Sequence, residues 1–276
     1  MRIRKALIMA AGYGTRFLPV TKVVQKEMLP VLNKPVIDYI VDDCIRAGIE
    51  EILIVVNEAD SQIEQYYTQK PSLELYLTKK GKADIAAEIQ QLHTKASFTF
   101  IVDADDCKYG TALPLIAAER YLKDEEAFLV MTGDDFLYDP AGASPLAELV
   151  LFAEEFPASA IVTCTEVAEE DVFKYGIAEN REVEGRKFLT RLIEKPHPSE
   201  TTSRLAGISK YVFTPEIFPV LAELQPNEKS GEYFLTDAVE QLASFRDVAL
   251  FQTKHMFLDC GNIANWLHTN MVLAEK

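Results

Sequence analysis

The sequence has no apolar run of the roughly 18–20 residues that a membrane-spanning helix needs. Its basic start, residues 1–5, is followed by only a short apolar run, and that run leads into a glycine loop rather than a signal-peptide cleavage pattern. No linker, internal repeat or low-complexity tract interrupts the 276 residues. We therefore expect no membrane contact and a soluble protein that stays in the cytoplasm.

Clustered metal and disulfide motifs are also missing. The four cysteines, Cys44, Cys107, Cys164 and Cys260, lie far apart and form no CxxC pair, and the four histidines show no metal-ligand spacing. These spacings argue against a zinc site or a disulfide framework. They favour buried free thiols.

Positive charge is scarce as well. Lys and Arg number 28 against 43 Asp and Glu, which gives a formal net charge of −15. A general nucleic-acid binder neutralises phosphates with Lys and Arg, so we expect no nucleic-acid partner. An enzyme that handles small phosphates remains compatible with this charge if a few cations and a metal ion gather at one site.

Short apolar runs alternate with segments of helical period through the first half of the chain. This alternation is typical of βαβ units, and it predicts an α/β fold with a doubly wound, mostly parallel but mixed sheet. The expected strands are 6–10, 51–56, 98–102 and 127–132, and the expected helices are 36–47 and 112–122.

The pattern becomes less regular after about residue 165, although one domain over residues 1–276 is still the simplest organisation. A polar, helix-prone stretch at about 61–95 predicts a peripheral helical insertion. The later elements that we expect are short strands at 176–178, 188–193 and 208–213, and helices at 215–224, 235–245 and 263–275.

A glycine loop follows the first predicted strand. Gly12 and Gly14 would let the backbone approach a ligand and leave N–H groups free for phosphate. The dinucleotide fingerprint requires a further glycine where Phe17 stands, and the P-loop requires Gly-Lys-Ser/Thr, so neither standard motif fits. Arg16 and Lys26 supply nearby cations, which favours a phosphate-binding loop over a plain tight turn.

Several short motifs appear together and in one order. The chain thereby resembles the sugar-1-phosphate nucleotidyltransferases, with their Rossmann-like fold, and is most similar to the bacterial UTP–glucose-1-phosphate uridylyltransferases. The resemblance covers nearly the whole chain. Its motifs are 12–19 (GYGTRFLP), 26–30 (KEMLP), 133–134 (GD), 175–176 (YG), 194–196 (EKP), 235–238 (LTDA) and 259–262 (DCGN).

The resemblance implies an enzyme of sugar-nucleotide biosynthesis that condenses UTP with glucose 1-phosphate, uses Mg²⁺ and forms homo-oligomers. It assigns catalytic roles to Arg16 and Lys26 and metal binding to Asp134 and Asp259. The residues that it implies for the nucleotide are Ala11, Gly12, Gly14, Thr15, Arg16, Lys26, Asp103 and Gly110. Those that it implies for the sugar phosphate are Gly176, Glu194 and Lys195.

These residue types suit the reaction. The attacking phosphate oxygen is already ionised, so positioning and charge stabilisation are the enzyme's main tasks. Mg²⁺ prefers carboxylate oxygens such as those of Asp134 and Asp259, while a neutral sugar hydroxyl suits Glu194 and a phosphate suits Lys195. Asp135 stands beside Asp134, and successive strand residues face opposite sides, so normally one of the two faces the site. Motif position favours Asp134.

The sequence departs from the uridylyltransferase pattern at two positions. Asp103 stands where a base-reading glutamine is expected, and a carboxylate can accept from uracil N3–H but cannot donate to the ring carbonyls. Gln25 replaces a proline before the 26–30 motif. The departure at Asp103 therefore leaves the base open. The sequence does not settle the hexose either.

Three alternatives follow from these departures and motifs. The same chemistry could use dTTP, CTP or another hexose 1-phosphate. A non-catalytic sensor or scaffold that binds sugar nucleotides is a second possibility. A dinucleotide-dependent oxidoreductase is disfavoured by the missing third glycine.

Overall fold

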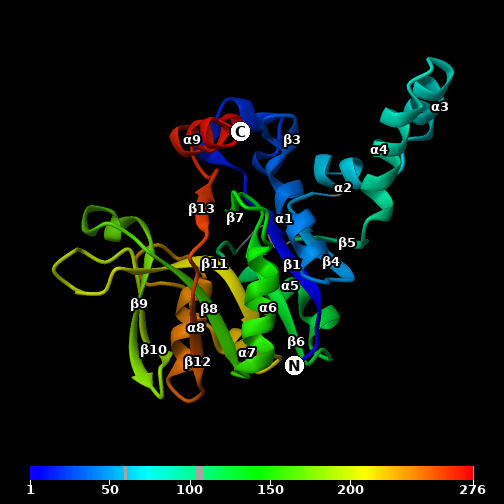
Figure 1. Cartoon of the computed structure of the whole chain (residues 1–276). Helices are drawn as coiled ribbons and strands as arrows, with labels where there is room; N and C mark the ends of the chain where they lie inside the picture. Colours follow the sequence, from blue (N-terminus) through cyan, green and yellow to red (C-terminus); the bar gives the residue numbers. More distant parts are fainter. Residues whose placement is uncertain (59–60, 104–107, 276) are drawn as a thin grey trace.

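A central mixed sheet organises the computed structural model, which describes residues 1–58, 61–103 and 108–275 (Figure 1). In the described residues this sheet has nine strands in the order β5-β4-β1-β6-β11-β8-β12-β10-β9. The strands are β1 (Ile3–Ala10), β4 (Glu51–Val56), β5 (Ser97–Val102), β6 (Ala127–Thr132), β8 (Ala160–Glu166), β9 (Gly176–Val183), β10 (Arg186–Glu194), β11 (Leu205–Phe213) and β12 (Val248–Gln252).

The two halves of this sheet differ in strand direction. The neighbours among β5, β4, β1 and β6 are all parallel. In contrast, β11 runs antiparallel to β6, β8 and β9, and β10 runs antiparallel to β12 and β9, while β8 and β12 are parallel. The expected α/β fold with a mixed sheet is confirmed. The expectation of a mostly parallel sheet does not hold for the described residues, because parallel pairing is confined to the run β5-β4-β1-β6 and to the β8–β12 pair.

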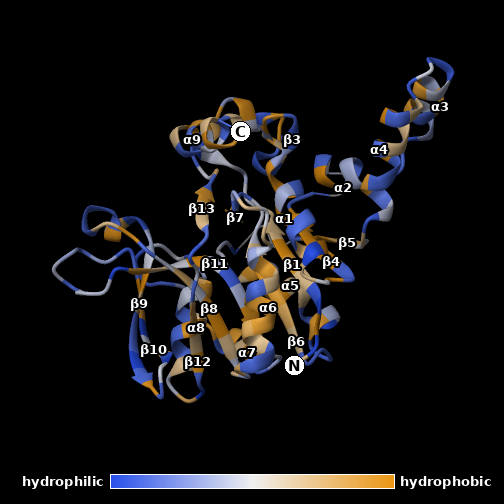
Figure 2. Cartoon of the chain, viewed as in Figure 1, coloured by the Kyte–Doolittle hydropathy of each residue, from blue (hydrophilic) through white to orange (hydrophobic). Residues whose placement is uncertain are grey.

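Helices cover both faces of the sheet because successive side chains on each strand alternate between two cores. Along β1, Ile8 belongs to one core and Leu7 to the other. The first core includes α1 (Val36–Arg46) and α6 (Pro145–Glu155), and the second includes α5 (Leu113–Leu122), α7 (Ile217–Glu223) and α8 (Leu235–Ala243). In Figure 2 the central strands and α6 are mostly hydrophobic, whereas the outer strands β9 and β10 are largely hydrophilic.

Three helices join β4 to β5 within the stretch 61–95. They are α2 (Gln62–Tyr67), α3 (Pro71–Lys79) and α4 (Ala83–Thr94), and Figure 1 shows α3 and α4 extending away from the sheet. Ser61 caps α2 by accepting a hydrogen bond from the backbone N–H of Glu64 at 3.1 Å. Pro71 lies in the first turn of α3, where its missing N–H leaves no helical bond unmade.

Two small antiparallel pairs lie beyond the carboxyl ends of the parallel strands. One joins β2 (Pro30–Val31) to β3 (Lys34–Pro35), and the other joins β7 (Asp135–Tyr138) to β13 (Met256–Asp259). The second pair sets Asp259 opposite Asp135, although 124 residues separate them in sequence. Helix α9 (Ile263–Ala274) follows β13 and lies beside the β2–β3 region in Figure 1.

The described part of the chain shows whether any helix could span a membrane and whether the cysteines are free. No helix there combines the length and the apolar character that a membrane span requires. Cys44, Cys164 and Cys260 are buried free thiols, as expected, and Cys107 lies outside the described residues.

Candidate active site

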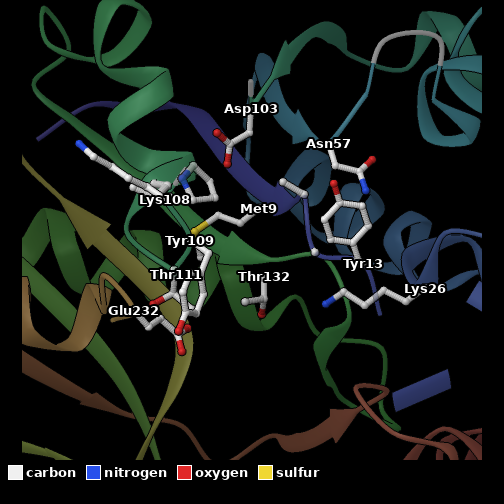
Figure 3. Close-up of a pocket in the computed structure, with 15 residues that line it drawn as sticks. Met9, Tyr13, Lys26, Asn57, Asp103, Lys108, Tyr109, Thr111, Thr132 and Glu232 are labelled. Atoms are coloured by element: carbon white, nitrogen blue, oxygen red, sulfur yellow. The ribbon is translucent and has the colours of Figure 1, made fainter. Parts of the chain in front are cut away.

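A cavity of about 430 Å³ lies at the carboxyl ends of the parallel strands. Such ends meet at one edge of a parallel sheet, which is where α/β proteins commonly bind ligands. We call this cavity of about 430 Å³ the first cavity. Figure 3 shows its lining residues, which are Met9, Ala11, Gly12, Tyr13, Lys26, Asn57, Asp103, Lys108, Tyr109, Gly110, Thr111, Leu113, Pro114, Thr132 and Glu232.

The glycine loop is folded around the Lys26 side chain. A Cβ atom on Gly12 would lie 3.4 Å from Lys26 Cε, and one on Gly14 would lie 3.0 Å from Lys26 Cβ. Gly14 also has a φ of +61°, and its carbonyl accepts a hydrogen bond from the Thr21 hydroxyl at 2.8 Å. Because Gly12 and Gly14 have no side chains, the Lys26 side chain has room to reach the cavity wall.

Lys26 is held by two carboxylates. Its Nζ lies 2.6 Å from Asp134 Oδ2 and 3.4 Å from Glu27 Oε1. Burial alone would lower the pKa of Lys26, but the charges of Asp134 and Glu27 outweigh burial and raise this pKa above its ordinary value. Lys26 therefore remains a cation that can bind phosphate.

Glu27 is a fully buried carboxyl group behind Lys26. Neither of its oxygens has a hydrogen-bond partner among the described residues, and the Lys26 contact is an ion pair without hydrogen-bond geometry. Burial raises the pKa of Glu27 to about 7, against the opposing effect of Lys26. A Cβ on Gly133 would lie 2.9 Å from Glu27 Cγ, so this glycine makes room for the buried side chain.

Asp134, Asp259 and Arg16 gather around Gly261. A Cβ at Gly261 would lie 2.9 Å from Asp259 Oδ1, 3.4 Å from Asp134 Oδ2 and 3.8 Å from Arg16 Nη1. Asp259 is oriented by the backbone N–H of Gly261 at 2.6 Å and by the Asn265 amide at 2.5 Å. Two carboxylates from distant parts of the chain thus converge beside an arginine.

Asp134 and Asp135 are neighbours in sequence with different surroundings. Asp135 is buried and pairs with the buried Lys210, and it also accepts a hydrogen bond from the Thr132 hydroxyl. Burial raises the pKa of Asp135 despite Lys210, whereas for Asp134 the Lys26 charge overcomes burial and lowers the pKa. Asp135 therefore pairs with Lys210 in the core, whereas Asp134 contacts Lys26 at the first cavity.

A second cavity, of about 360 Å³, adjoins the first. Its wall includes Arg16 and the ends of β9 and β10, where Gly176 lies opposite Glu194. A Cβ on Gly176 would lie 3.2 Å from Glu194 Oε2, so the absence of a side chain there leaves the carboxylate accessible. The residues that line the second cavity are Met9, Arg16, Thr111, Thr132, Lys174, Tyr175, Gly176, Glu194, Lys195, Gly207, Ser209, Tyr211, Glu232, Phe234, Leu235 and Thr236.

Lys195 follows β10 in an uncommon backbone conformation. Its φ is +46°, and its N–H donates to the Tyr175 carbonyl at 3.1 Å. Its ammonium lies 3.3 Å from Glu194 Oε1, and its side chain is 55% exposed. The turn thus places a cation and an acceptor side by side at the second cavity.

The two cavities share one wall. The residues common to both linings are Met9, Thr111, Thr132 and Glu232. Tyr233 crosses the segment 109–112, donating to the Tyr109 carbonyl and accepting from the Ala112 N–H, each at 3.0 Å. Gly110, with a φ of +143°, fits under this crossing because a Cβ there would lie 2.2 Å from the Tyr233 carbonyl oxygen.

The structure separates the predicted site residues into groups. Gly14 and Thr15 line neither cavity, and Gly14 shapes the loop instead. Asp134 and Asp259 also line neither, but they meet beside Arg16. Those at the first cavity are Ala11, Gly12, Lys26, Asp103 and Gly110, and those at the second are Arg16, Gly176, Glu194 and Lys195.

Sequence reasoning missed several lining residues. Asn57 directly follows β4 at the same sheet edge as Asp103, a position that the strand pattern could have indicated. Glu232 lines both cavities, and burial raises its pKa while Lys195 lowers it and Glu194 raises it further. No sequence pattern marks Glu232, because its placement depends on the crossing at Tyr233.

The carboxylates offer a partial metal site. No group of three or more His, Cys, Asp or Glu side chains that could hold a metal ion occurs among the described residues. Two convergent carboxylates nevertheless fit Mg²⁺, which commonly takes one or two protein carboxylates and completes its shell with water and phosphate.

Comparisons with known proteins show which proteins the chain resembles. A family model described as nucleotidyl transferase matches residues 5–276. The chain is 35% identical over all 276 residues to the UTP–glucose-1-phosphate uridylyltransferase of Bacillus subtilis (strain 168), of which it covers 92%. It is 34% identical to a UTP–glucose-1-phosphate uridylyltransferase of Staphylococcus epidermidis, again over its whole length and 93% of the relative.

Solved structures are similar as well. A UDP-glucose pyrophosphorylase complexed with UDP-glucose has a TM-score of 0.86 and 31% identity, with 99% of each chain covered. A UTP-bound UGPase from Acinetobacter baumannii has a TM-score of 0.88 and 29% identity, over 99% of this chain and 93% of that one.

Proposed function

Because the chain belongs to the nucleotidyl transferase family, we propose that it joins UTP to glucose 1-phosphate, forming UDP-glucose and releasing pyrophosphate. It is, on this proposal, a UTP–glucose-1-phosphate uridylyltransferase. The observation that carries the proposal is the pair of adjoining cavities with one shared wall. A reaction between two bound substrates needs such a pair, because their reacting atoms must meet.

The first cavity suits the nucleotide. The glycine loop at Ala11 and Gly12 exposes backbone close to Lys26, whose retained positive charge suits the triphosphate. Asp103 and Gly110 line the part of this cavity proposed for the nucleoside. The roles of Gly14 and Thr15 are indirect, because they form the turn that positions the loop.

The second cavity suits the hexose phosphate. Glu194 presents carboxylate oxygens that can accept hydrogen bonds from sugar hydroxyls, and Gly176 leaves space in front of them. Lys195 supplies a cation for the sugar phosphate, and Arg16 lies on the side near Asp134 and Asp259.

The reaction is an in-line displacement at the α-phosphorus. An oxygen of the sugar phosphate forms a bond to that phosphorus while the bond to the pyrophosphate oxygen breaks, and the pyrophosphate leaves with the electron pair. Lys26 and Arg16 stabilise the negative charge that develops during the displacement, and the two cavities hold the reacting atoms in line.

Asp134 and Asp259 would hold Mg²⁺, which when bound neutralises phosphate charge. In the free chain Asp134 is paired with Lys26, so a metal ion held by Asp134 would leave the Lys26 ammonium available to pair with the phosphates. Asp135 is excluded from this role by its buried pairing with Lys210.

We also propose that copies of the chain associate. Helix α9 contains no Asp, Glu, Lys or Arg, and it exposes Ile263, Leu267 and Met271 at intervals of four residues. Such an uncharged apolar stripe suits contact between copies that each carry a net charge of −15. Sedimentation equilibrium tests this part of the proposal, and a monomer at micromolar concentration would reject it.

The direct test of function is pyrophosphate release from purified protein with glucose 1-phosphate, Mg²⁺ and each of UTP, dTTP, CTP, ATP and GTP in turn. Release that is fastest with UTP supports the uridylyltransferase. Preference for dTTP or CTP would keep the chemistry and change the substrate. Binding of UDP-glucose without release from any triphosphate or sugar phosphate would favour a sensor or scaffold.

A further inference from the structure

Asn57 and Asp103 lie next to each other at one end of the first cavity. Asn57 directly follows β4 and Asp103 directly follows β5, and these strands pair in register at Val56 and Val102. The Asp103 N–H also donates to the Val56 carbonyl at 2.8 Å. Figure 3 shows both side chains at the end of the cavity that lies away from Glu232.

The Asn57 amide has an unmade hydrogen bond. Its Oδ1 atom is buried from solvent and has no hydrogen-bond partner among the described residues. A buried polar atom in this state destabilises the free protein, so such atoms are commonly completed by a ligand or an ordered water. Asn57 also lines the cavity, which places it within reach of a bound ligand.

The chemistry of the two side chains favours Asn57 as the base reader. Uracil presents an N3–H donor between two carbonyl acceptors, so one amide can accept from N3–H and donate to a neighbouring carbonyl. The Asp103 carboxylate can only accept, and it would meet the carbonyl with like partial charge. The amide that Asp103 lacks is therefore supplied by Asn57, which directly follows the adjacent strand β4.

We propose that Asn57 recognises the uracil base of UTP through its side-chain amide, an inference that rests on the proposed function. Oδ1 accepts from N3–H, and Nδ2 donates to an adjacent ring carbonyl. Cytosine presents an acceptor at N3 and an amino group in place of one carbonyl, so the same amide orientation opposes it at both positions. Held in this orientation, the Asn57 amide favours UTP over CTP.

The experiment measures kcat/KM for UTP and for CTP with saturating glucose 1-phosphate. Asn57→Ala should lower kcat/KM for UTP about 10- to 100-fold and should lower the UTP/CTP ratio. Asn57→Asp, which has nearly the same shape, keeps an acceptor and loses the donor, so it should also lose preference for UTP. Asn180→Ala, on an exposed position of β9, is the matched control and should keep the wild-type ratio.

Two further readouts make the result decisive. Thermal melts identify any variant that fails to fold, and the KM for glucose 1-phosphate should stay within about twofold of wild type because Asn57 lies outside the second cavity. A wild-type UTP/CTP ratio in folded Asn57→Ala overturns the proposal. So does a ratio that changes in Asp103→Asn but not in Asn57→Ala, which would assign base reading to Asp103.

Failure of this inference can be told apart from failure of the proposed function. Wild-type protein that releases pyrophosphate from no triphosphate rejects the proposed function. Wild-type protein that prefers UTP, together with an Asn57→Ala variant that keeps this preference, rejects the role of Asn57 alone.

Discussion

The two cavities share a wall but are built in different ways. The first lies at the ends of parallel strands, and its main cation, Lys26, is mostly buried between Asp134 and Glu27. The second lies on the antiparallel part of the sheet, where Glu194 and Lys195 contact each other with 28% and 55% of their side chains exposed. Buried charges interact strongly because little water screens them, whereas exposed pairs contribute little.

This contrast predicts larger effects from changes beside the first cavity than from changes at the second. Substitutions at Asp134, Glu27, Gly110 and Glu194 test the contrast, in order of decreasing expected effect.

Asp134→Ala should have the largest effect. It removes a proposed metal ligand and also the closest partner of Lys26, so we expect kcat/KM to fall about 100- to 1,000-fold. The measurement is pyrophosphate release as Mg²⁺ is varied. Activity near that of the wild type at limiting Mg²⁺ would refute the assignment.

Asp135→Asn is the control for that variant. It breaks the buried pair with Lys210, so its main effect should be a loss of about 3–5 kcal/mol in the free energy of unfolding. Denaturant titration of both variants should show that Asp135 affects chiefly stability and Asp134 chiefly turnover. The reverse result would exchange their roles.

Glu27 predicts a pH dependence of stability. Its pKa is raised by burial from an ordinary 4.5 to about 7, so between these values the folded state holds a proton that the unfolded state has lost. The free energy of unfolding should therefore fall as pH rises through this window, by about 3 kcal/mol for this group. Denaturant titrations at pH 5 and pH 8 should show a smaller fall in Glu27→Gln than in wild type.

The same titrations at pH 5 serve as the reference, because Glu27 is then mostly protonated and resembles glutamine. If the wild type and Glu27→Gln lose stability equally between pH 5 and pH 8, the raised pKa of Glu27 is wrong.

Gly110→Ala tests the wall between the cavities. The new Cβ would lie 2.2 Å from the Tyr233 carbonyl oxygen, so the crossing would have to open. Gly142→Ala is the matched control, because Gly142 has a φ of +87° and nothing within 4 Å of an added Cβ. Thermal or chemical unfolding should show Gly110→Ala destabilised by about 1–3 kcal/mol more than the control. Equal losses of stability in the two variants would mean that the Tyr233 crossing accommodates the added methyl group with little strain.

Glu194→Gln should have the smallest effect. A neutral acceptor replaces a carboxylate that is partly exposed, so we expect the KM for glucose 1-phosphate to rise about tenfold. The KM for UTP should change little, and Glu182→Gln, on an exposed part of β9, should change neither value. A larger rise in the KM for UTP than for the sugar phosphate would reverse the assignment of the cavities.

The same contrast explains how much the sequence could predict. Strands β1, β4 and β6 were predictable to within a few residues because each contains a continuous apolar run buried on both faces. The edge strand β5 is only partly buried, but its residues Phe98, Phe100 and Ile101 still marked it as a strand. On the other side of the sheet, β9 and β10 were predicted too short, because their outer ends are exposed and polar. Strands β8 and β12 and helix α6 were not predicted.

The site residues also divide into those that local sequence motifs could identify and those that only tertiary packing brings together. Gly12, Lys26 and Glu194 lie in local motifs that sequence can identify, and the structure brings them to two adjoining cavities. The partners of Asp134 and Asp135 could not be read from sequence, because Lys26 and Lys210 meet them only through tertiary packing. Glu232 was missed for the same reason.

The crossing of Tyr233 over residues 109–112 has a thermodynamic consequence. Its two backbone hydrogen bonds, together with the bond from the Leu235 N–H to the Thr111 hydroxyl, join a segment of the first cavity to a segment of the second. A ligand that shifts one segment should shift the other through these bonds, so we expect the affinity for each proposed substrate to depend on whether the other is bound. This coupling is reciprocal, and the nucleotide must alter the affinity for the sugar phosphate by the same factor by which the sugar phosphate alters the affinity for the nucleotide.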